Sequence, residues 1–292
     1  MRLSALEIHD RVSNAITRLQ DDGGAFRRFT DKYKLDRLGF WLATRFRYFP
    51  GSATPQDFLT FGPYASVSKY QTALETLVEK KMAERAGEGR YKLVDSARKA
   101  VNDTYNEFFS RLARLNGLPD DDAEALLGWV DRVYSAALRQ SDVPAPILNA
   151  AHSVLPDVDA VWVQVERRLV GLSIFRVDAH VAAWREAGYT GPRIELSTLL
   201  FRAGDGLSHD DLRASADRLD DKDFTSALSA LHSGGEVTER GERYRLSKAG
   251  RAAREAIEMA TDANYARPFG ALEEDEFDRM VQVLEKLSPE AK

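Results

Sequence analysis

Residues 66–72 place polar side chains three and four positions apart, as on one face of a helix, and basic side chains follow soon after. A glutamine amide can bond two atoms of an adenine edge, hydroxyl groups can bond bases or phosphates, and Lys and Arg attract phosphates. Side chains of these types in this order are candidate contacts to duplex DNA: Ser66, Ser68, Lys69, Gln71 and Thr72, followed by Arg85, Arg90 and Lys92.

A second set of similar side chains lies in the other half of the chain and comprises Lys222, Thr225, Ser226, Arg240, Arg243 and Arg245. This set begins with three carboxylates, Asp220, Asp221 and Asp223. Carboxylates that face phosphates reduce affinity for DNA. We therefore expect DNA contact mainly through the first set. Whether the second set contacts DNA or serves as a scaffold stays open at this stage.

Residue types that commonly perform catalysis or bind metals do not form recognisable motifs. The chain has no cysteine, and its five histidines are scattered. His209-Asp210-Asp211 is better explained as a helix start capped by Ser208 than as a metal cluster. The sequence contains no Gly-rich phosphate loop and no nucleophile elbow. We therefore expect no enzymatic activity, no cofactor and no metal.

The elements that must position the polar side chains occur twice. Residues 73–85 read ALETLVEKKMAER, and residues 227–240 read ALSALHSGGEVTER. Residues 89–100 read GRYKLVDSARKA, and residues 242–253 read ERYRLSKAGRAA. Repeats this far apart exceed the period of solenoid units. They indicate one small domain that is duplicated within the chain.

The first copy predicts helices followed by a hairpin. Apolar periodicity predicts a helix over 37–48 and another that begins at Ser66. Between them, Thr54 followed by proline predicts a short capped helix through residue 61. Strands over 82–85 and 90–94 would enclose a glycine-containing tip, and a long helix over 96–116 would follow.

The second copy predicts the same order of elements. Helices are expected over 194–201, from Ser208, and around Phe224–Leu231, with strands over 236–240 and 243–246 and a helix from Ser247 or Lys248. Each copy ends in an amphipathic helix, near residues 118 and 272, whose apolar face the other copy can cover. Three helices, a two-stranded wing and a following helix form a winged helix-turn-helix. An unspecific helical domain with a hairpin is the alternative.

Composition is ordinary for a folded protein, but the charge is uneven. Apolar residues make up 43% of the 292 residues, charged residues 30%, and the net charge is −5. Residues 26–100 contain 15 Lys+Arg against 8 Asp+Glu, whereas residues 201–256 contain 10 against 11. The basic excess favours a polyanionic partner, with an ordinary solvated surface as the alternative. The chain has no apolar run long enough to span a membrane and no secretory signal pattern, so we expect a cytoplasmic protein.

The chain resembles the MarR-like winged-helix regulators. The resemblance rests on the pattern S-x-S-K-Y-x-x-A-L-x-x-L-V-E-K over Ser66–Lys80, then Glu-Arg, Tyr-Lys-Leu, and Ser96-Ala97 at the start of a helix. The second copy matches over 227–231, 238–240 and 244–250. Such proteins usually act as homodimers that place two recognition helices in successive major grooves. The resemblance implies that this chain is such a dimer fused into one molecule, with residues 158–184 as entry helices of the second lobe.

These observations predict a mainly α protein with small β-hairpin wings. Two tandem winged helix-turn-helix lobes, in domains 1–150 and 151–292, would be joined by long helices into a dimer-like arrangement with a pseudo-two-fold axis. The expected partners are double-stranded DNA and a small-molecule effector, and the internal dimer would let the chain act as a monomer. Aromatic residues that could line an effector pocket are Trp41, Phe46, Tyr48 and Trp184. The alternatives are a protein-interaction scaffold that does not bind DNA and a ligand-binding scaffold.

Overall fold

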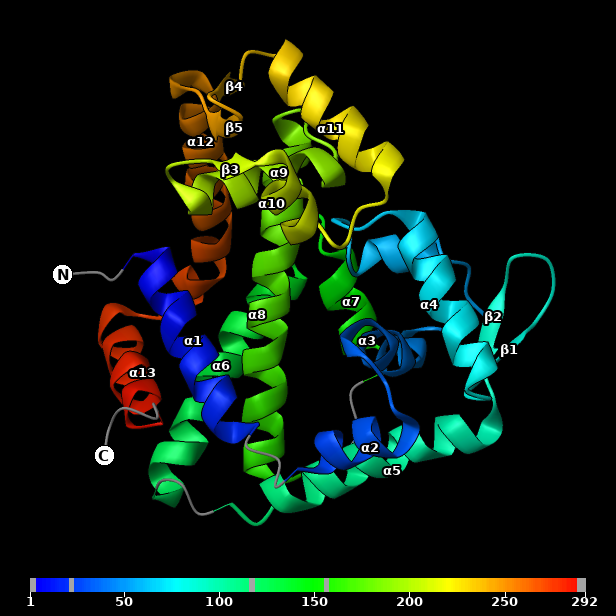
Figure 1. Cartoon of the computed structure of the whole chain (residues 1–292). Helices are drawn as coiled ribbons and strands as arrows, with labels where there is room; N and C mark the ends of the chain where they lie inside the picture. Colours follow the sequence, from blue (N-terminus) through cyan, green and yellow to red (C-terminus); the bar gives the residue numbers. More distant parts are fainter. Residues whose placement is uncertain (1–3, 21–23, 116–118, 155–157, 288–292) are drawn as a thin grey trace. The chain divides into compact units, whose positions relative to one another are not determined.

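The protein is mainly helical with small antiparallel sheets (Figure 1). The computed structural model describes residues 4–20, 24–115, 119–154 and 158–287. The chain forms two compact units, each discontinuous in sequence: unit 1 comprises 1–50, 93–179 and 262–292, and unit 2 comprises 51–92 and 180–261. Each half of the sequence therefore contributes to both units, which cut across the expected domains 1–150 and 151–292. The division into 1–150 and 151–292 remains a prediction about where one copy of the repeat ends and the other begins.

Unit 1 is built from helices. They are α1 (Ala5–Leu19), α2 (Ala25–Tyr33), α3 (Arg37–Arg45), η1 (Phe46–Tyr48), α5 (Asp95–Leu112), α6 (Asp120–Leu138), α7 (Pro146–His152), η3 (Arg267–Ala271) and α13 (Glu274–Lys286). Two further helices, α8 (Val161–Glu186) and α12 (Lys248–Ala266), carry residues of both units. The helix predicted over 37–48 is α-helical to Arg45 and ends in the 3-10 turn η1. The end predicted for the helix after the first wing, Asn116, lies outside the described residues.

The two terminal amphipathic helices, α6 and α13, pack against each other, as the sequence predicts. Both bury apolar stripes, with Leu126 on α6 and Met280 on α13 fully enclosed. Arg132 of α6 pairs with Glu276 of α13 at 2.6 Å between Nη2 and Oε1. Helix α13 also packs on α1, next to which Figure 1 places it. The apolar face that each copy leaves open is therefore covered within unit 1.

Unit 2 contains both hairpins and the helices that precede them. Its elements are η2 (Asp57–Thr60), α4 (Val67–Glu79), β1 (Ala83–Arg85), β2 (Tyr91–Leu93), α9 (Gly191–Ala203), β3 (Leu207–Ser208), α10 (His209–Ser215), α11 (Asp221–Ser233), β4 (Val237–Arg240) and β5 (Arg243–Leu246). The short helix predicted after Thr54 is the 3-10 turn η2, whose N-cap position is Gln56 and not Thr54. The Asp57 N–H still donates to Thr54 Oγ1, at 3.3 Å. Gly62-Pro63 follows too soon for a regular helix to continue.

Helices α4 and α11 bury the stripes that their periodicity predicts. The buried side chains are Tyr70, Ala73, Leu74 and Leu77 on α4, and Phe224, Ala227, Leu228 and Leu231 on α11. These two sets occupy equivalent positions in the repeat. Each helix therefore turns the same face to its core and leaves the same face to solvent.

Both hairpins form, and a third extended segment joins each of them. In the second, β3 pairs with β5 so that Leu207 opposes Tyr244. In the first, an isolated antiparallel bridge joins Ala53 to Tyr91 in the equivalent place. The turn of the second hairpin places Gly241 and Glu242 at positive φ, 57° and 63°, as a tight two-residue hairpin turn requires.

Candidate nucleic-acid interface

The outer face of α4 carries most of the side chains nominated from the first copy. Ser68, Gln71 and Thr72 are exposed, and Lys69 is half-buried. They lie opposite the buried stripe because residues three and four apart share a helix face. The structure thus brings together an amide, an ammonium group and hydroxyl groups on one surface.

Ser66 is the exception, and its assignment as a DNA contact is corrected here. Its side chain is only 1% exposed. The Asp220 N–H donates to Ser66 Oγ at 2.9 Å, and the Ser66 N–H donates to the Arg218 carbonyl oxygen at 2.9 Å. Although Ser66 is the N-cap residue of α4, its hydroxyl makes no capping bond to its own helix. A sequence pattern identifies a cap position but not the neighbour that covers it.

The same junction engages Ser68 and Asp220. Ser68 Oγ donates to Asp220 Oδ2 at 2.5 Å, while Asp220 Oδ1 accepts the Asp223 N–H at 2.8 Å as the N-cap of α11. The Ser68 bond, then the Asp223 N–H, holds the pKa of Asp220 below its usual value. Ser66 and Asp220 are equivalent positions of the repeat, so the two helices meet N-terminus to N-terminus. Figure 1 shows them leading away from this point.

The segment just before α4 is packed against second-copy elements of unit 2. A Cβ atom on Gly191 would lie 1.7 Å from the Pro63 carbonyl oxygen, so this approach requires glycine. The Tyr64 ring lies against the rings of Trp184 and His180, with centroids 6.4 and 6.2 Å away. Burial raises the pKa of Tyr64 to about 12. The junction of the two helices is therefore one part of a packed interface.

The basic residues of the first wing are largely engaged within the protein. Arg85 Nη2 lies 2.6 Å from Glu75 Oε2, and Tyr91 Oη donates to Glu75 Oε1 at 2.5 Å. The Tyr91 bond, followed by the Arg85 bond, lowers the pKa of Glu75. Sequence reasoning missed Glu75, although its place one turn after Gln71 puts it on the outer face of α4. The Arg85 charge is thus matched by a carboxylate.

The other two basic residues of this wing also have local partners. Arg90 donates from Nε to Ser52 Oγ at 2.8 Å and from Nη2 to the Ser52 carbonyl at 2.6 Å. Lys92 Nζ lies 2.9 Å from Glu84 Oε1 across the hairpin. Of the three, only Arg90 is left without a carboxylate among the residues that the structure describes.

Helix α11 exposes the three polar residues nominated from the second copy, Lys222, Thr225 and Ser226. The carboxylates at its start have partners. Asp220 caps the helix and accepts from Ser68, and Asp221 Oδ1 lies 2.7 Å from Arg213 Nη2. Beyond the first turn, the exposed face continues with Ser229, His232 and Ser233 and carries no carboxylate. The carboxylates expected to repel DNA phosphates are therefore confined to the start of α11, and two of them already have partners within the protein.

The second wing has a cluster of arginines, which are Arg240, Arg243 and Arg245. Arg240 and Arg243 oppose each other directly across the β4–β5 pair, an unfavourable arrangement for like charges. Arg243 Nη2 donates to the Gly206 carbonyl at 2.6 Å. Within the described ranges, no carboxylate forms an ion pair with any of the three. At the α11 position equivalent to Glu75 stands Ser229, so the arginine equivalent to Arg85, Arg240, lacks a matching carboxylate.

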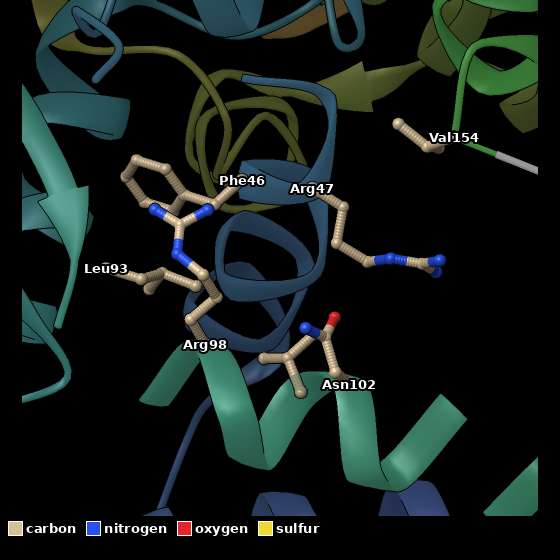
Figure 2. A pocket seen from close by; sticks show the side chains of 7 residues that line it. Phe46, Arg47, Leu93, Arg98, Asn102 and Val154 are labelled. Carbon is tan, nitrogen blue, oxygen red and sulfur yellow. The ribbon is translucent and has the colours of Figure 1, made fainter. Parts of the chain in front are cut away.

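Unit 1 contains a small pocket of about 190 Å³, lined by Phe46, Arg47, Leu93, Arg98, Val101, Asn102 and Val154. Figure 2 shows the Arg98 guanidinium rising from α5 beside the Phe46 ring, with Arg47 on the other side. Arg47 also lies over the Tyr105 ring at 3.9 Å. The pocket therefore combines two guanidinium groups and an amide with an apolar wall.

Of the aromatic residues expected at an effector pocket, Phe46 lines this one. Trp184 belongs to the core of unit 2. Trp41 and Tyr48 instead lie beside the Arg45 guanidinium, at 5.3 and 5.7 Å from ring centroid to Cζ.

Ser208 caps α10 as predicted, with the Asp211 N–H donating to its Oγ at 3.1 Å. In the described parts of the chain, no three His, Asp or Glu side chains are grouped so that they could hold a metal ion. The described helices also include none that is long and apolar enough to cross a membrane.

The model of the helix-turn-helix family matches residues 71–291, which is more than half of the chain and includes most of α4, both wings and α11. No curated protein matches the chain. The extent of the family match, together with a helix and an antiparallel hairpin in each copy, leads to one conclusion: the chain belongs to the helix-turn-helix family.

Proposed function

We propose that this protein is a DNA-binding transcriptional regulator whose two copies are MarR-like winged helices fused into an internal pseudo-dimer. The observation that carries the proposal is the second wing, which has three arginines without carboxylate partners among the described residues and follows α11, a helix whose exposed face carries no carboxylate beyond its first turn. Phosphates are the partner that such a basic edge fits, and hydroxyl groups on a helix can contact bases. The proposed role includes no catalytic activity.

Two features support the fused-dimer part of the proposal. The terminal helices α6 and α13, which occupy equivalent places in the repeat, pack on each other as the dimerisation helices of two chains would. The bridge from Ala53 to Tyr91 and the pair Leu207–Tyr244 also fall at equivalent places. A common ancestry of the two copies accounts for both.

The test is fluorescence anisotropy with a labelled random-sequence duplex over a series of salt concentrations. Binding through phosphates releases counterions, so the logarithm of affinity should fall linearly with the logarithm of salt concentration, by about 0.9 for each phosphate contacted. Joint Lys69→Ala and Gln71→Ala substitution should weaken binding to a selected site by tenfold or more if each contact contributes about 1–3 kcal/mol. A chain with no salt-sensitive affinity for duplex DNA would refute the proposal.

We propose in addition that the pocket of unit 1 binds a small organic anion as an effector. Arg98 and Arg47 supply positive charge, Asn102 a hydrogen-bonding amide, and Phe46 an apolar wall. Burial lowers the pKa of Arg167, with Glu166 opposing the shift and the Arg47 charge adding to it. Benzoate should raise the melting temperature while benzyl alcohol should not, and Arg98→Gln should abolish the difference.

The alternative is a protein-interaction scaffold that does not bind DNA. The pairing of Arg85 with Glu75 and of Lys92 with Glu84 favours it for the first copy, because these bases are matched within the protein. Recovery of a stable protein partner, together with no salt-sensitive affinity for duplex DNA, would decide for the scaffold.

A further inference from the structure

The N-termini of α4 and α11 are too close together for the binding mode of a helix-turn-helix homodimer. The backbone N–H of Asp220 donates to Ser66 Oγ at 2.9 Å. Adding the covalent bonds on either side places the Cα atoms of these two cap residues at most about 7 Å apart. In helix-turn-helix dimers, the N-terminal residues of the two recognition helices contact base edges one helical turn of DNA apart, about 34 Å.

The remainder of each helix cannot make up the difference. Helices α4 and α11 each have 13 residues, so each is about 20 Å long. With the caps about 7 Å apart, the midpoints of the two helices cannot be separated by more than about 29 Å, even if the helices were collinear. Two successive major grooves on one side of a duplex are therefore out of reach for these two helices as they stand.

The junction is also held by contacts beyond the cap residues. Ser68 donates to the Asp220 carboxylate, and the Ser66 N–H donates to the Arg218 carbonyl. Pro63 lies against Gly191, where a Cβ atom has no room, and Tyr64 is packed beside Trp184. Separating the two helices would expose the Tyr64 ring and leave buried polar groups without partners, which is costly. These contacts make the two helices one body.

We propose that unit 2 binds DNA as this closed body, at a single site no longer than one turn of the duplex, so that one chain occupies one half-site. A bipartite operator would then require two chains. The proposal rests on the proposed DNA-binding function and replaces the idea that one fused chain spans two successive grooves. The partner that the surface fits is a short, continuous duplex site.

The first arm of the test locks the junction. The chain contains no cysteine, so Ser68→Cys with Asp220→Cys introduces the only two thiols. A short bifunctional thiol reagent should bridge them within one chain, as peptide mapping by mass spectrometry would show. Thr72→Cys with Ser226→Cys, at equivalent positions four residues beyond Ser68 and six beyond Asp220, is the matched control and should not be bridged. Failure to bridge residues 68 and 220 would overturn the closed geometry without any reference to DNA.

The second arm compares DNA binding before and after bridging. Because Ser68 lies on the candidate interface, the unbridged reference is the same double variant with both thiols blocked by a monofunctional thiol reagent of similar size. The bridged and unbridged proteins should then bind a random-sequence duplex with dissociation constants within twofold of each other. A loss of more than tenfold on bridging, with the unbridged variant still binding, would mean that the helices must separate to bind DNA and would overturn the proposal.

The third arm measures the site itself. Selection from a random 30-base-pair library should yield one continuous block, and a duplex of about 12 base pairs carrying it should bind one chain as tightly as a longer duplex. Two blocks about 10 base pairs apart, bound by a single chain, would overturn the inference but leave the proposed function intact. If the wild-type chain binds no duplex in any salt, the proposed function itself fails.

Discussion

The two wings have similar sequences but differ in how their charges are used. Arg85 in the first wing and Arg240 in the second are equivalent, yet Arg85 is matched by Glu75, whereas the residue equivalent to Glu75 in the second copy is Ser229. Counting charges along the sequence favours the first copy as the DNA-binding part. Counting the charges left after internal pairing favours the second wing. The difference shows that the basic excess of a segment does not identify which of its basic residues lack a carboxylate neighbour in the folded protein.

The outer faces of the two helices differ in the same direction. The outer face of α4 carries Glu75 and Glu79, whereas the carboxylates of α11 are confined to its first turn. There, Asp220 and Asp221 already have partners. Both glutamates of α4 are serines at the equivalent positions of α11, Ser229 and Ser233. The first of these differences also removes the carboxylate that pairs with the wing arginine in the first copy.

The largest effect is expected where the two copies differ at the helix after the wing. Gly250 lies in the first turn of α12, where a Cβ atom would lie 2.1 Å from the Glu236 carbonyl oxygen, whereas the first copy has Ala97 at this position. Gly250→Ala should lower the free energy of unfolding by about 3 kcal/mol because backbone must shift. Ala97→Gly should cost about 1 kcal/mol through helix propensity alone. Urea denaturation measures both, and equal effects would show that the two helix starts pack alike.

The next effect concerns DNA affinity and compares the two wings directly. Arg240→Ala with Arg243→Ala should weaken binding to a random-sequence duplex by tenfold or more and should lower the salt slope by up to about 2. Arg85→Ala with Lys92→Ala should change affinity by less than about threefold, because both residues are already paired. Fluorescence anisotropy over a salt series gives both numbers. The reverse order would assign the phosphate contacts to the first wing.

A substitution in α11 should make the second copy resemble the first. Ser229→Glu places a carboxylate where it can pair with Arg240, as Glu75 pairs with Arg85, and should lower DNA affinity about fivefold through charge neutralisation and repulsion. Ser229→Gln has a similar size without the charge and is the control. An equal loss with both variants would point to steric obstruction in place of charge.

The smallest effect is expected from the converse change in α4. Glu75→Gln keeps an acceptor for Tyr91 but removes the charge that matches Arg85, so affinity for DNA should rise about threefold. The lowered pKa of Glu75 keeps this carboxyl ionised from neutral pH to below its usual titration range, so its pairing with Arg85 is lost only as the pH falls through that lowered value. Measurement at pH 7 therefore compares a fully charged with an uncharged side chain. Unchanged affinity would mean that the first wing does not approach the duplex.

Local features of this fold could be predicted from the sequence. The buried stripes of α4 and α11, both hairpins and the Ser208 cap follow from apolar spacing, turn residues and capping preferences within a few residues. The contact between α6 and α13 could be predicted because each is an amphipathic helix whose apolar face must be buried against another element. Such signals are short-range or depend only on a face being apolar.

Contacts between distant polar residues could not be predicted in this way. Ser66 reads as an exposed helix cap, and only the approach of Asp220 buries it. The pairing of Glu75 with Arg85 depends on how the hairpin folds back on α4. Likewise, two discontinuous units arise because equivalent parts of both halves pack together, which periodicity along the chain does not encode.

The meeting of Ser66 with Asp220 has a consequence for how such a protein arises. In a symmetric pair of identical subunits, the residue at this place would face its own counterpart across the axis, and an aspartate would meet an aspartate. If, as we propose, the two copies derive from such a pair, their covalent joining lifts that restriction, since each copy can then change alone. A hydroxyl on one side and an acid on the other give complementary partners that identical subunits cannot present to each other on a two-fold axis.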